Sequence, residues 1–201
     1  MEKSSSVKVM KWRGQVCPAT ACFSSRSIMK QLLLIRHGKS DWAQPGLADH
    51  DRPLSERGLR DIPLIAEALL ERGIAPDVIL TSTAVRAATT AEMMAGAMGF
   101  PAEKILQVPG LYLAPPGGIL RAVQRIDESV RTVLVFGHNP GMHETVMAFP
   151  AGEGIADFPT LAVARFEITA EHWGLFEWDS ARLIEVVTPR GLPGGEGRRE
   201  F

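Results

Sequence analysis

Short apolar runs in the chain alternate with longer segments in which apolar residues recur at helical spacing. The runs of strand length are at 32–35, 78–80, 105–108, 132–136, 161–168 and 183–187. Between the first two runs, one apolar helix face is formed by Ile62, Ile65, Ala66, Leu69 and Leu70. Strands that alternate with helices in this way indicate an α/β fold around a mostly parallel sheet.

The segment between the first two apolar runs has the start and stop signals of a helix. Ser55 is suited to cap its first turn, and Gly73 follows its last turn near Arg72. Pro63 lies inside the segment, and a proline in a helix interior removes a hydrogen bond and clashes with the preceding turn. We therefore expect a helix that Pro63 kinks or divides.

Two further helices are expected after later strands. The first should be capped by one of the three hydroxyl residues at 81–83 and run to about Met98. The second should follow the GHNPG segment at 137–141 and end near Ala148. The segment 109–118 is rich in proline and glycine, so it is expected to be a loop.

Length and composition indicate one globular domain and disfavour several classes of protein. The chain has 201 residues, of which 45% are hydrophobic, so we expect one well-filled core over residues 29–190. The formal net charge of -1 argues against a nucleic acid partner and against attraction to a membrane surface. No apolar run approaches the roughly 20 residues that cross a bilayer. We expect a cytoplasmic protein.

The two ends of the chain differ in composition from the rest. Residues 1–28 are rich in serine and carry a net charge of +4, from Lys3, Lys8, Lys11, Arg13 and Arg26 against Glu2. This segment is either an organellar targeting segment or an extended start ahead of Met29, and in both cases we expect it to be disordered. Cys17 and Cys22 lack the neighbours of a metal site. Residues 191–201 are expected to form a loose tail.

Basic side chains and imidazoles stand where the predicted strands end. Arg36 and His37 follow the first strand, Arg86 lies in the opening turn of the helix after the second, and His138 follows the fourth. Open α/β sheets bind ligands at the carboxyl ends of their strands. These four side chains, from three separate parts of the chain, are therefore expected to meet at one edge of the sheet.

Each of these features also has an ordinary explanation. RHG after a strand can be a plain loop, GHNPG can be a turn, and Arg86 can be a solvated helix residue. Together they point to an anion, because burying several groups of like charge is unfavourable unless an anion binds. Guanidinium groups hold phosphate oxygens in pairs, and the helix N-termini after Ser82 and Asn139 would add backbone donors. The pattern predicts a phosphate pocket.

Three ordered segments also resemble a known family. RHG at 36–38, TSTAVRAATTAEMM at 81–94 and GHNPGM at 137–142 resemble the motifs of the histidine phosphatase (phosphoglycerate-mutase-like) superfamily. DHDRPLSERG at 49–58 and FPT at 158–160 resemble its SixA-type phosphohistidine phosphatase branch. The resemblance implies a three-layer α/β/α fold with a mostly parallel central sheet, and a phosphatase that needs neither a metal ion nor another cofactor.

The resemblance also implies a role for each candidate residue. His37 would attack phosphorus in line and form a phosphohistidine that water then hydrolyses. Arg36, Arg86 and His138 would hold the phosphoryl oxygens and offset the charge of the transition state. Asn139 would add a further contact to the substrate.

One residue of the wider superfamily is missing. Many members carry a glutamate proton donor after the third strand, but the segment PGLYLAPPG at 109–117 of this chain contains no carboxylate. The SixA-type branch lacks this acid as well. A phosphoramidate nitrogen can be protonated before it leaves, so this absence favours phosphohistidine over an alkyl phosphate. Asp41 and Asp51 are candidate acids, although loop capping or an ion pair with Arg52 or Arg57 is the favoured explanation for both.

The sequence therefore predicts a phosphohistidine phosphatase, and two alternatives stay open. No insertion is long enough for a large lid, which suits a side chain presented by a phosphorylated protein, unless the loops at 41–50 and 150–159 fold over the site. The first alternative is a phosphatase of small phosphate esters or anhydrides. The second is a module that binds a phosphorylated partner without turnover.

Overall fold

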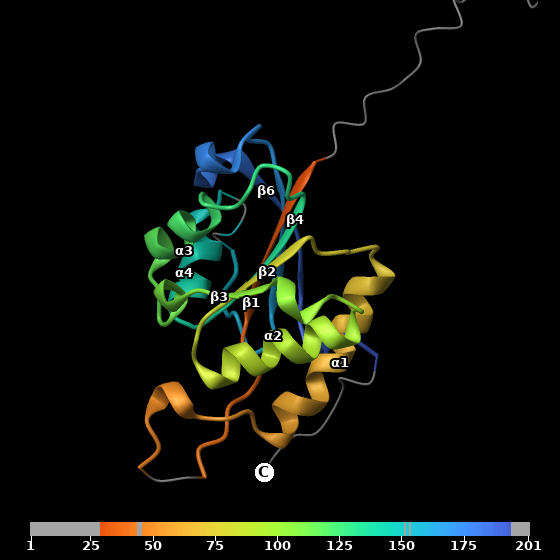
Figure 1. Cartoon of the computed structure of the whole chain (residues 1–201). Helices are drawn as coiled ribbons and strands as arrows, with labels where there is room; N and C mark the ends of the chain where they lie inside the picture. Colours follow the sequence, from red (N-terminus) through yellow and green to blue (C-terminus); the bar gives the residue numbers. More distant parts are fainter. Residues whose placement is uncertain (1–28, 44–45, 151, 153, 194–201) are drawn as a thin grey trace, which may run out of the picture.

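The computed structural model describes residues 29–43, 46–150, 152 and 154–193. The expectations for residues 1–28 and for 194–201 lie outside the described residues. A twisted sheet forms the centre, and helices cover both of its faces (Figure 1). None of the helices in the described part of the chain is long and apolar enough to cross a membrane.

The sheet has six strands in the order β3-β2-β4-β1-β5-β6. Their bounds are Lys30–Arg36 (β1), Val78–Thr81 (β2), Ile105–Gln107 (β3), Thr132–Gly137 (β4), Val163–Ile168 (β5) and Ala181–Val187 (β6). The pairs β1–β4, β2–β4 and β2–β3 are parallel, whereas β5 runs antiparallel to both β1 and β6. Only β5 is reversed, so the predicted mostly parallel α/β fold is confirmed.

Four helices pack on the sheet in pairs. They are α1 (Glu56–Glu71), α2 (Val85–Ala97), α3 (Pro116–Val123) and α4 (Gly141–Ala148). Short 3-10 turns are η1 (Asp49–Asp51), η2 (Ala102–Lys104), η3 (Pro109–Leu111), η4 (Trp173–Leu175), η5 (Trp178–Ser180) and η6 (Pro189–Gly191). One face of the sheet packs on α1 and α2 and the other on α3 and α4, as Figure 1 shows.

The apolar run before Arg36 is explained by these two layers. Leu32 and Leu34 point into the core shared with α3 and α4, whereas Leu33 and Ile35 point into the core shared with α1 and α2. All four are fully buried, and a central strand covered on both faces needs apolar residues at every position. The strand therefore lies deep in the protein, and its end carries Arg36 to the sheet edge.

Three expectations about helices need correction. Pro63 does not divide α1, because it lies on the exposed side, where water can solvate the carbonyl that its missing N–H leaves unbonded. The N-cap of α2 is Ala84, which makes no side-chain capping bond, instead of a hydroxyl residue at 81–83. The expected loop at 109–118 contains the start of α3, because a proline fits the first turn of a helix.

The predicted cap of α1 is confirmed. The Ser55 Oγ accepts a hydrogen bond from the Gly58 N–H at 3.2 Å, and its own hydroxyl donates to the Lys39 carbonyl at 3.1 Å. Gly58 lies so close to the Lys39 carbonyl that a Cβ at this position would overlap it. The cap therefore fastens the start of α1 to the segment that follows His37.

Candidate active site

The ends of β1 and β4 bring two histidines together. These strands pair in parallel with Arg36 beside Gly137, and the His37 N–H donates to the Gly137 carbonyl at 3.1 Å. The rings of His37 and His138 follow, with centroids 5.0 Å apart. Their exposed fractions are 7% and 2%. The shared strand edge thus places both imidazoles in one buried pocket.

The ring of His37 is held in one orientation. Its Nδ1 lies 2.6 Å from the Gly38 carbonyl oxygen, and since a carbonyl only accepts, the hydrogen-bond network assigns the proton to Nδ1. Burial lowers the pKa of His37 to about 4, and the charges of Arg86 and Arg36 act in the same direction, against the bond to Gly38. His37 is therefore neutral at pH 7, with the lone pair on Nε2.

The ring of His138 is held differently. Its Nε2 lies 2.8 Å from the Ser82 Oγ, while its buried Nδ1 has no hydrogen-bond partner among the described residues. Burial is the main cause that lowers the pKa of His138 to about 3, and the neighbouring His37 and Arg86 contribute to this shift. Tyr112 packs edge-on against this ring, with centroids 5.5 Å apart. The free Nδ1 is a polar atom that a ligand in the pocket can satisfy.

Arg86 lies in the first turn of α2 and is only 4% exposed. Its Nε donates to the His37 Nε2 at 3.3 Å. One turn later, the Thr90 Oγ1 accepts from the Gly38 N–H at 3.0 Å and donates to the Arg86 carbonyl at 2.6 Å. Thr90, which the sequence analysis missed, therefore fastens the segment after His37 to the helix that carries Arg86.

Asp49 is a second residue that the sequence analysis missed. Its Oδ2 accepts from the Arg86 Nη2 at 2.8 Å and from the Tyr112 hydroxyl at 2.9 Å, and its carbonyl accepts from the Arg86 Nη1. The side chain is 48% exposed. Burial acts to raise the pKa of Asp49, but the bonds from Tyr112 and Arg86 outweigh it and hold that pKa below its usual value. Asp49 is thus a carboxylate ion bound to Arg86.

The candidate acids of the sequence analysis are placed elsewhere. The Asp41 Oδ1 accepts from the Ala43 N–H at 2.8 Å, which agrees with the favoured explanation of loop capping. The Asp51 Oδ1 lies 3.1 Å from the His50 Nδ1. The suggested ion pairs are wrong, because Arg52 pairs with Asp49 at 3.1 Å, and Arg57 pairs with Asp61 at 3.4 Å.

Arg36 and Asn139 are joined through the loop before β5. The Arg36 Nη1 and the Asn139 Nδ2 both donate to the Phe158 carbonyl, at 2.9 and 3.0 Å. Two further atoms, the Arg36 Nε and the Asn139 Oδ1, are buried without a partner among the described residues. The FPT segment noted in the sequence thus supplies the carbonyl that orients two of the predicted substrate-binding residues.

The loop between β3 and α3 closes one side of the site. It carries Tyr112, which contacts Asp49 and His138, and Leu113, which lines the cavity. The Ala114 carbonyl of this loop lies so close to Gly141 that a Cβ on Gly141 would overlap it. The loop is therefore packed directly against the start of α4.

Several of these residues line a cavity of about 390 Å³. Four cationic side chains and the two histidines border it: Arg36, Lys39, Arg52, Arg86, His37 and His138. The Arg52 guanidinium stacks on Trp42, 3.2 Å from the ring centroid. Asp49 is the one carboxylate that borders this cavity among the described residues. Such a cavity is suited to bind an anion of the size and charge of phosphate.

Comparison with known proteins identifies the family. The model of the histidine phosphatase superfamily (branch 1) matches residues 32–111, which include two of the three motifs. An uncharacterized protein of Mycobacterium tuberculosis is 34% identical over 166 residues, which cover 78% of this chain and all of that protein. This chain belongs to the histidine phosphatase superfamily.

Within this superfamily the chain is similar to the SixA branch. The crystal structure of a SixA from Agrobacterium tumefaciens matches with a TM-score of 0.67 and 31% identity, covering 80% of this chain and 98% of that one. The phosphohistidine phosphatase SixA of Escherichia coli is 28% identical over 150 residues, covering 74% of this chain and 91% of that protein. Superfamily membership indicates a phosphatase, and the predicted fold and branch are confirmed.

Proposed function

We propose that this histidine phosphatase removes phosphate from phosphohistidine on a protein, with His37 as the nucleophile. The observation that carries the proposal is the geometry of His37. Its Nδ1 is tied to the Gly38 carbonyl, so the lone pair of the neutral ring is on Nε2, at a cavity bordered by Arg86. The Arg86 Nε donates to this lone pair, and a phosphoryl group that binds Arg86 would take over that donor and free Nε2. A neutral imidazole is a competent nucleophile toward phosphorus near neutral pH.

The proposed reaction has two displacements. The His37 Nε2 attacks phosphorus, the bond from phosphorus to the substrate imidazole breaks, and the substrate histidine leaves. The Gly38 carbonyl keeps its bond to Nδ1–H and stabilises the positive charge that develops on the ring. Water then attacks phosphorus, the bond to His37 breaks, and inorganic phosphate is released with His37 neutral again.

The neighbouring side chains would hold the phosphoryl oxygens. Arg36 and Arg86 supply guanidinium groups, and the unpartnered atoms Arg36 Nε and His138 Nδ1 have donors to offer in the pocket. The Ser82 hydroxyl can donate to the His138 Nε2, which leaves the ring proton on Nδ1 for an oxygen of phosphate. Asn139, turned toward Phe158, orients the same wall. No step in this scheme requires a metal ion.

The state of Asp49 supports phosphohistidine over an alkyl phosphate. An alkoxide leaving group needs a proton from an acid, but the lowered pKa of Asp49 keeps this carboxylate deprotonated. A phosphoramidate nitrogen can take its proton from water before it leaves. The similarity to the phosphohistidine phosphatase SixA of Escherichia coli supports the same substrate class. We propose that residues 29–190 form the domain that carries this activity.

Turnover and labelling test the proposal together. A purified protein phosphorylated on histidine is compared with a panel of phosphate esters and anhydrides, in the presence and absence of EDTA. We expect the phosphohistidine protein to have the higher kcat/KM, with no effect of EDTA. A rapid alkaline quench, which preserves phosphohistidine, should trap labelled phosphate on His37 of the wild type and none on the His37→Ala variant.

Two outcomes would replace the proposal with its alternatives. A higher kcat/KM for a small ester would make the protein a phosphatase of small molecules. Binding of phosphate without any label or turnover would make it a binding module.

A further inference from the structure

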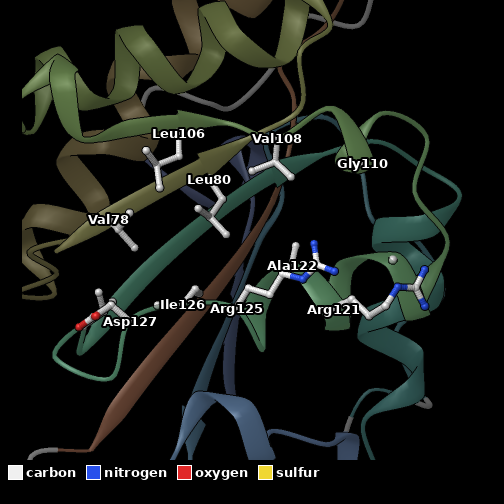
Figure 2. A pocket seen from close by; sticks show the side chains of 12 residues that line it. Val78, Leu80, Leu106, Val108, Gly110, Arg121, Ala122, Arg125, Ile126 and Asp127 are labelled. Atoms are coloured by element: carbon white, nitrogen blue, oxygen red, sulfur yellow. The ribbon is translucent and has the colours of Figure 1, made fainter.

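A second cavity lies on the face of the sheet that packs on α3, and we call it the β2–β3 groove (Figure 2). It measures about 490 Å³, and its floor consists of Val78 and Leu80 of β2, Leu106 of β3 and Val108, which directly follows β3. Figure 2 shows these side chains facing Ala122 and the segment that follows α3. The helices α3 and α4 cover the middle of the sheet and bury Leu80, but they leave Val78 and Val108 partly exposed and Leu106 half exposed.

The groove lies next to the candidate active site. Val78, Leu80 and Ser82 alternate along one chain segment and so point to the same face, and the Ser82 hydroxyl bonds His138. The Ser82 N–H still pairs with β4, so two residues of extended chain, about 7 Å, separate the groove floor from the site. The loop before α3 borders both, with Gly110 in the groove and Leu113 in the active-site cavity.

Two cations stand on the rim of the groove. Arg121 and Arg125 are four residues apart, both are exposed, and neither guanidinium takes part in a hydrogen bond or ion pair within the described ranges. Asp127 also borders the groove, and its Oδ1 accepts from the Ser129 N–H at 2.9 Å and from the Ser129 hydroxyl at 2.5 Å. It makes no ion pair with either arginine within the described ranges, so two positive charges stand against one negative charge at the groove. An apolar floor beside two unpaired guanidinium groups is complementary to an occupant that is both apolar and anionic.

The shape of the groove favours a protein segment over a small molecule. Within the described part of the chain, β3 pairs only with β2. The groove is therefore walled by α3 on one side and open on the other, beyond Leu106, which is 50% exposed. Small-molecule sites enclose most of their ligand, whereas grooves of this kind receive an amphipathic helix along its apolar face. The segment 1–28 of this chain carries +4 and would be repelled by Arg121 and Arg125.

We propose that the β2–β3 groove docks an acidic amphipathic helix of the phosphorylated protein, and so presents that protein to His37. This inference rests on the proposed function and adds the place where the protein substrate is held. Apolar side chains of the helix would cover Val78, Leu106 and Val108, and its carboxylates would pair with Arg121 and Arg125.

The first test compares two substrates in the full-length protein. Phosphohistidine is supplied either on a protein or as the free amino acid, to the wild type and to the Leu106→Asp and Arg121→Glu/Arg125→Glu variants. These side chains are exposed, so the variants should fold, which circular dichroism checks. We expect KM for the phosphoprotein to rise about tenfold or more with little change in kcat, and kinetics on the free amino acid to stay unchanged. Arg60→Glu, at an exposed position of α1, is a charge-reversal control away from the groove.

The second test uses a designed helical peptide as the probe. One version carries leucines at i, i+3, i+4 and i+7 with glutamates beside them, and its control carries lysines in place of the glutamates. The glutamate peptide should bind the wild type, lose at least about tenfold in affinity for the Arg121→Glu/Arg125→Glu variant, and inhibit turnover of the phosphoprotein but not of free phosphohistidine.

The results separate the two proposals. Equal kinetic changes for both substrates, no change for the phosphoprotein, or equal binding of both peptides would overturn the docking inference. If neither peptide bound but dodecanoate bound tightly, the inference would be overturned in favour of a small amphipathic anion. If the wild type bound the glutamate peptide in the groove but hydrolysed no phosphohistidine, the proposed function would be overturned, whereas the groove would still be a peptide-binding site.

Discussion

The histidines that follow β1 and β4 lie at neighbouring strand ends, yet their rings are held by different kinds of partner. His37 is bonded through Nδ1 to the Gly38 carbonyl, and His138 through Nε2 to the Ser82 hydroxyl. A carbonyl can only accept, so it holds the proton of His37 on Nδ1. A hydroxyl can donate or accept, so the proton of His138 can sit on either nitrogen. The partner of one nitrogen thus decides what the other can do.

The largest expected effect separates the two histidines directly. His37→Ala should abolish turnover, with a loss of at least about 10³-fold, because the nucleophile is gone. His138→Ala should lower kcat by about 10² to 10³, because an oxyanion contact is lost while the nucleophile remains. Rapid alkaline quench with labelled substrate should show label on His37 in the second variant only. Label on both variants, or on neither, would contradict the assignment.

The next largest effect concerns Arg86, which bonds the nucleophile but not His138. Arg86→Ala should lower kcat by about 10² to 10³, as the loss of one key oxyanion contact does. Arg86→Lys should recover part of this loss, because an ammonium keeps the charge without the planar fork. Single-turnover labelling of His37 measures the rate of phosphoryl transfer to His37. The control is Arg57→Ala on α1, and a loss in this control as large as in Arg86→Ala would argue against a specific contact.

Burial of both rings should make stability depend on pH. The pKa is lowered to about 4 for His37 and about 3 for His138, from the ordinary histidine value of 6.5, mainly by burial. Between about pH 4 and 6.5 the unfolded chain therefore binds more protons than the folded protein, so the free energy of unfolding falls as the pH falls. The loss by pH 4 should be about 3 kcal/mol for each histidine.

Urea unfolding at a series of pH values measures this dependence. His37→Ala and His138→Ala should each flatten it by a similar amount, because burial acts on both rings. If neither substitution changed the slope of the free energy of unfolding against pH, the pKa values of the two buried histidines would be ordinary.

A smaller effect is expected from the partner of His138. Ser82→Ala removes the hydroxyl that bonds Nε2, so the proton no longer favours Nδ1, and kcat should fall about tenfold. The pH profile of kcat should shift as well, whereas a merely structural role would leave the profile in place. Ser82→Thr keeps the hydroxyl and should restore both kcat and the profile. Failure of this rescue would remove Ser82 from the proposed mechanism.

The smallest effect should come from Asp49, whose charge acts on both histidines alike. Asp49→Asn removes a carboxylate that competes with phosphate for Arg86, so vanadate and phosphate should inhibit a few times more strongly. Glu103→Gln, outside the site, is the matched change of charge. Weaker inhibition in Asp49→Asn would show that Asp49 helps to hold Arg86 in place for the substrate.

The sequence predicted the parts of the protein that depend on buried strands. β1 and β4 are covered on both faces, so their apolar runs were unmistakable, and parallel strands necessarily deliver their last residues to one edge. This logic placed Arg36, His37 and His138 together. The exact strand ends differ by one or two residues, since Leu161, expected in β5, has a φ of 60° and precedes the strand.

The parts that were missed depend on contacts between distant segments. Asp49 opens the DHDRPLSERG segment, but only its bonds to Arg86 and Tyr112 place it in the site, and no periodic pattern reports such contacts. The helix α3 was hidden by prolines and glycines that are more typical of loops. The β2–β3 groove arises because α3 is short, which no feature of β2 or β3 foretells.

Gly141 gives the GHNPGM motif a packing role in addition to its role at the site. No side chain fits there, because the Ala114 carbonyl occupies the space, and Gly58 meets the Lys39 carbonyl in the same way. Both glycines belong to segments by which the family is recognised, yet each serves the protein's own assembly. Because they lack a Cβ, the loop that carries Tyr112 can pack closely on α4, and the segment after His37 can pack closely on α1. Part of the family's sequence motifs therefore has a steric role. A single methyl group added at either glycine would displace the segments that line the site, although neither glycine contacts the phosphate.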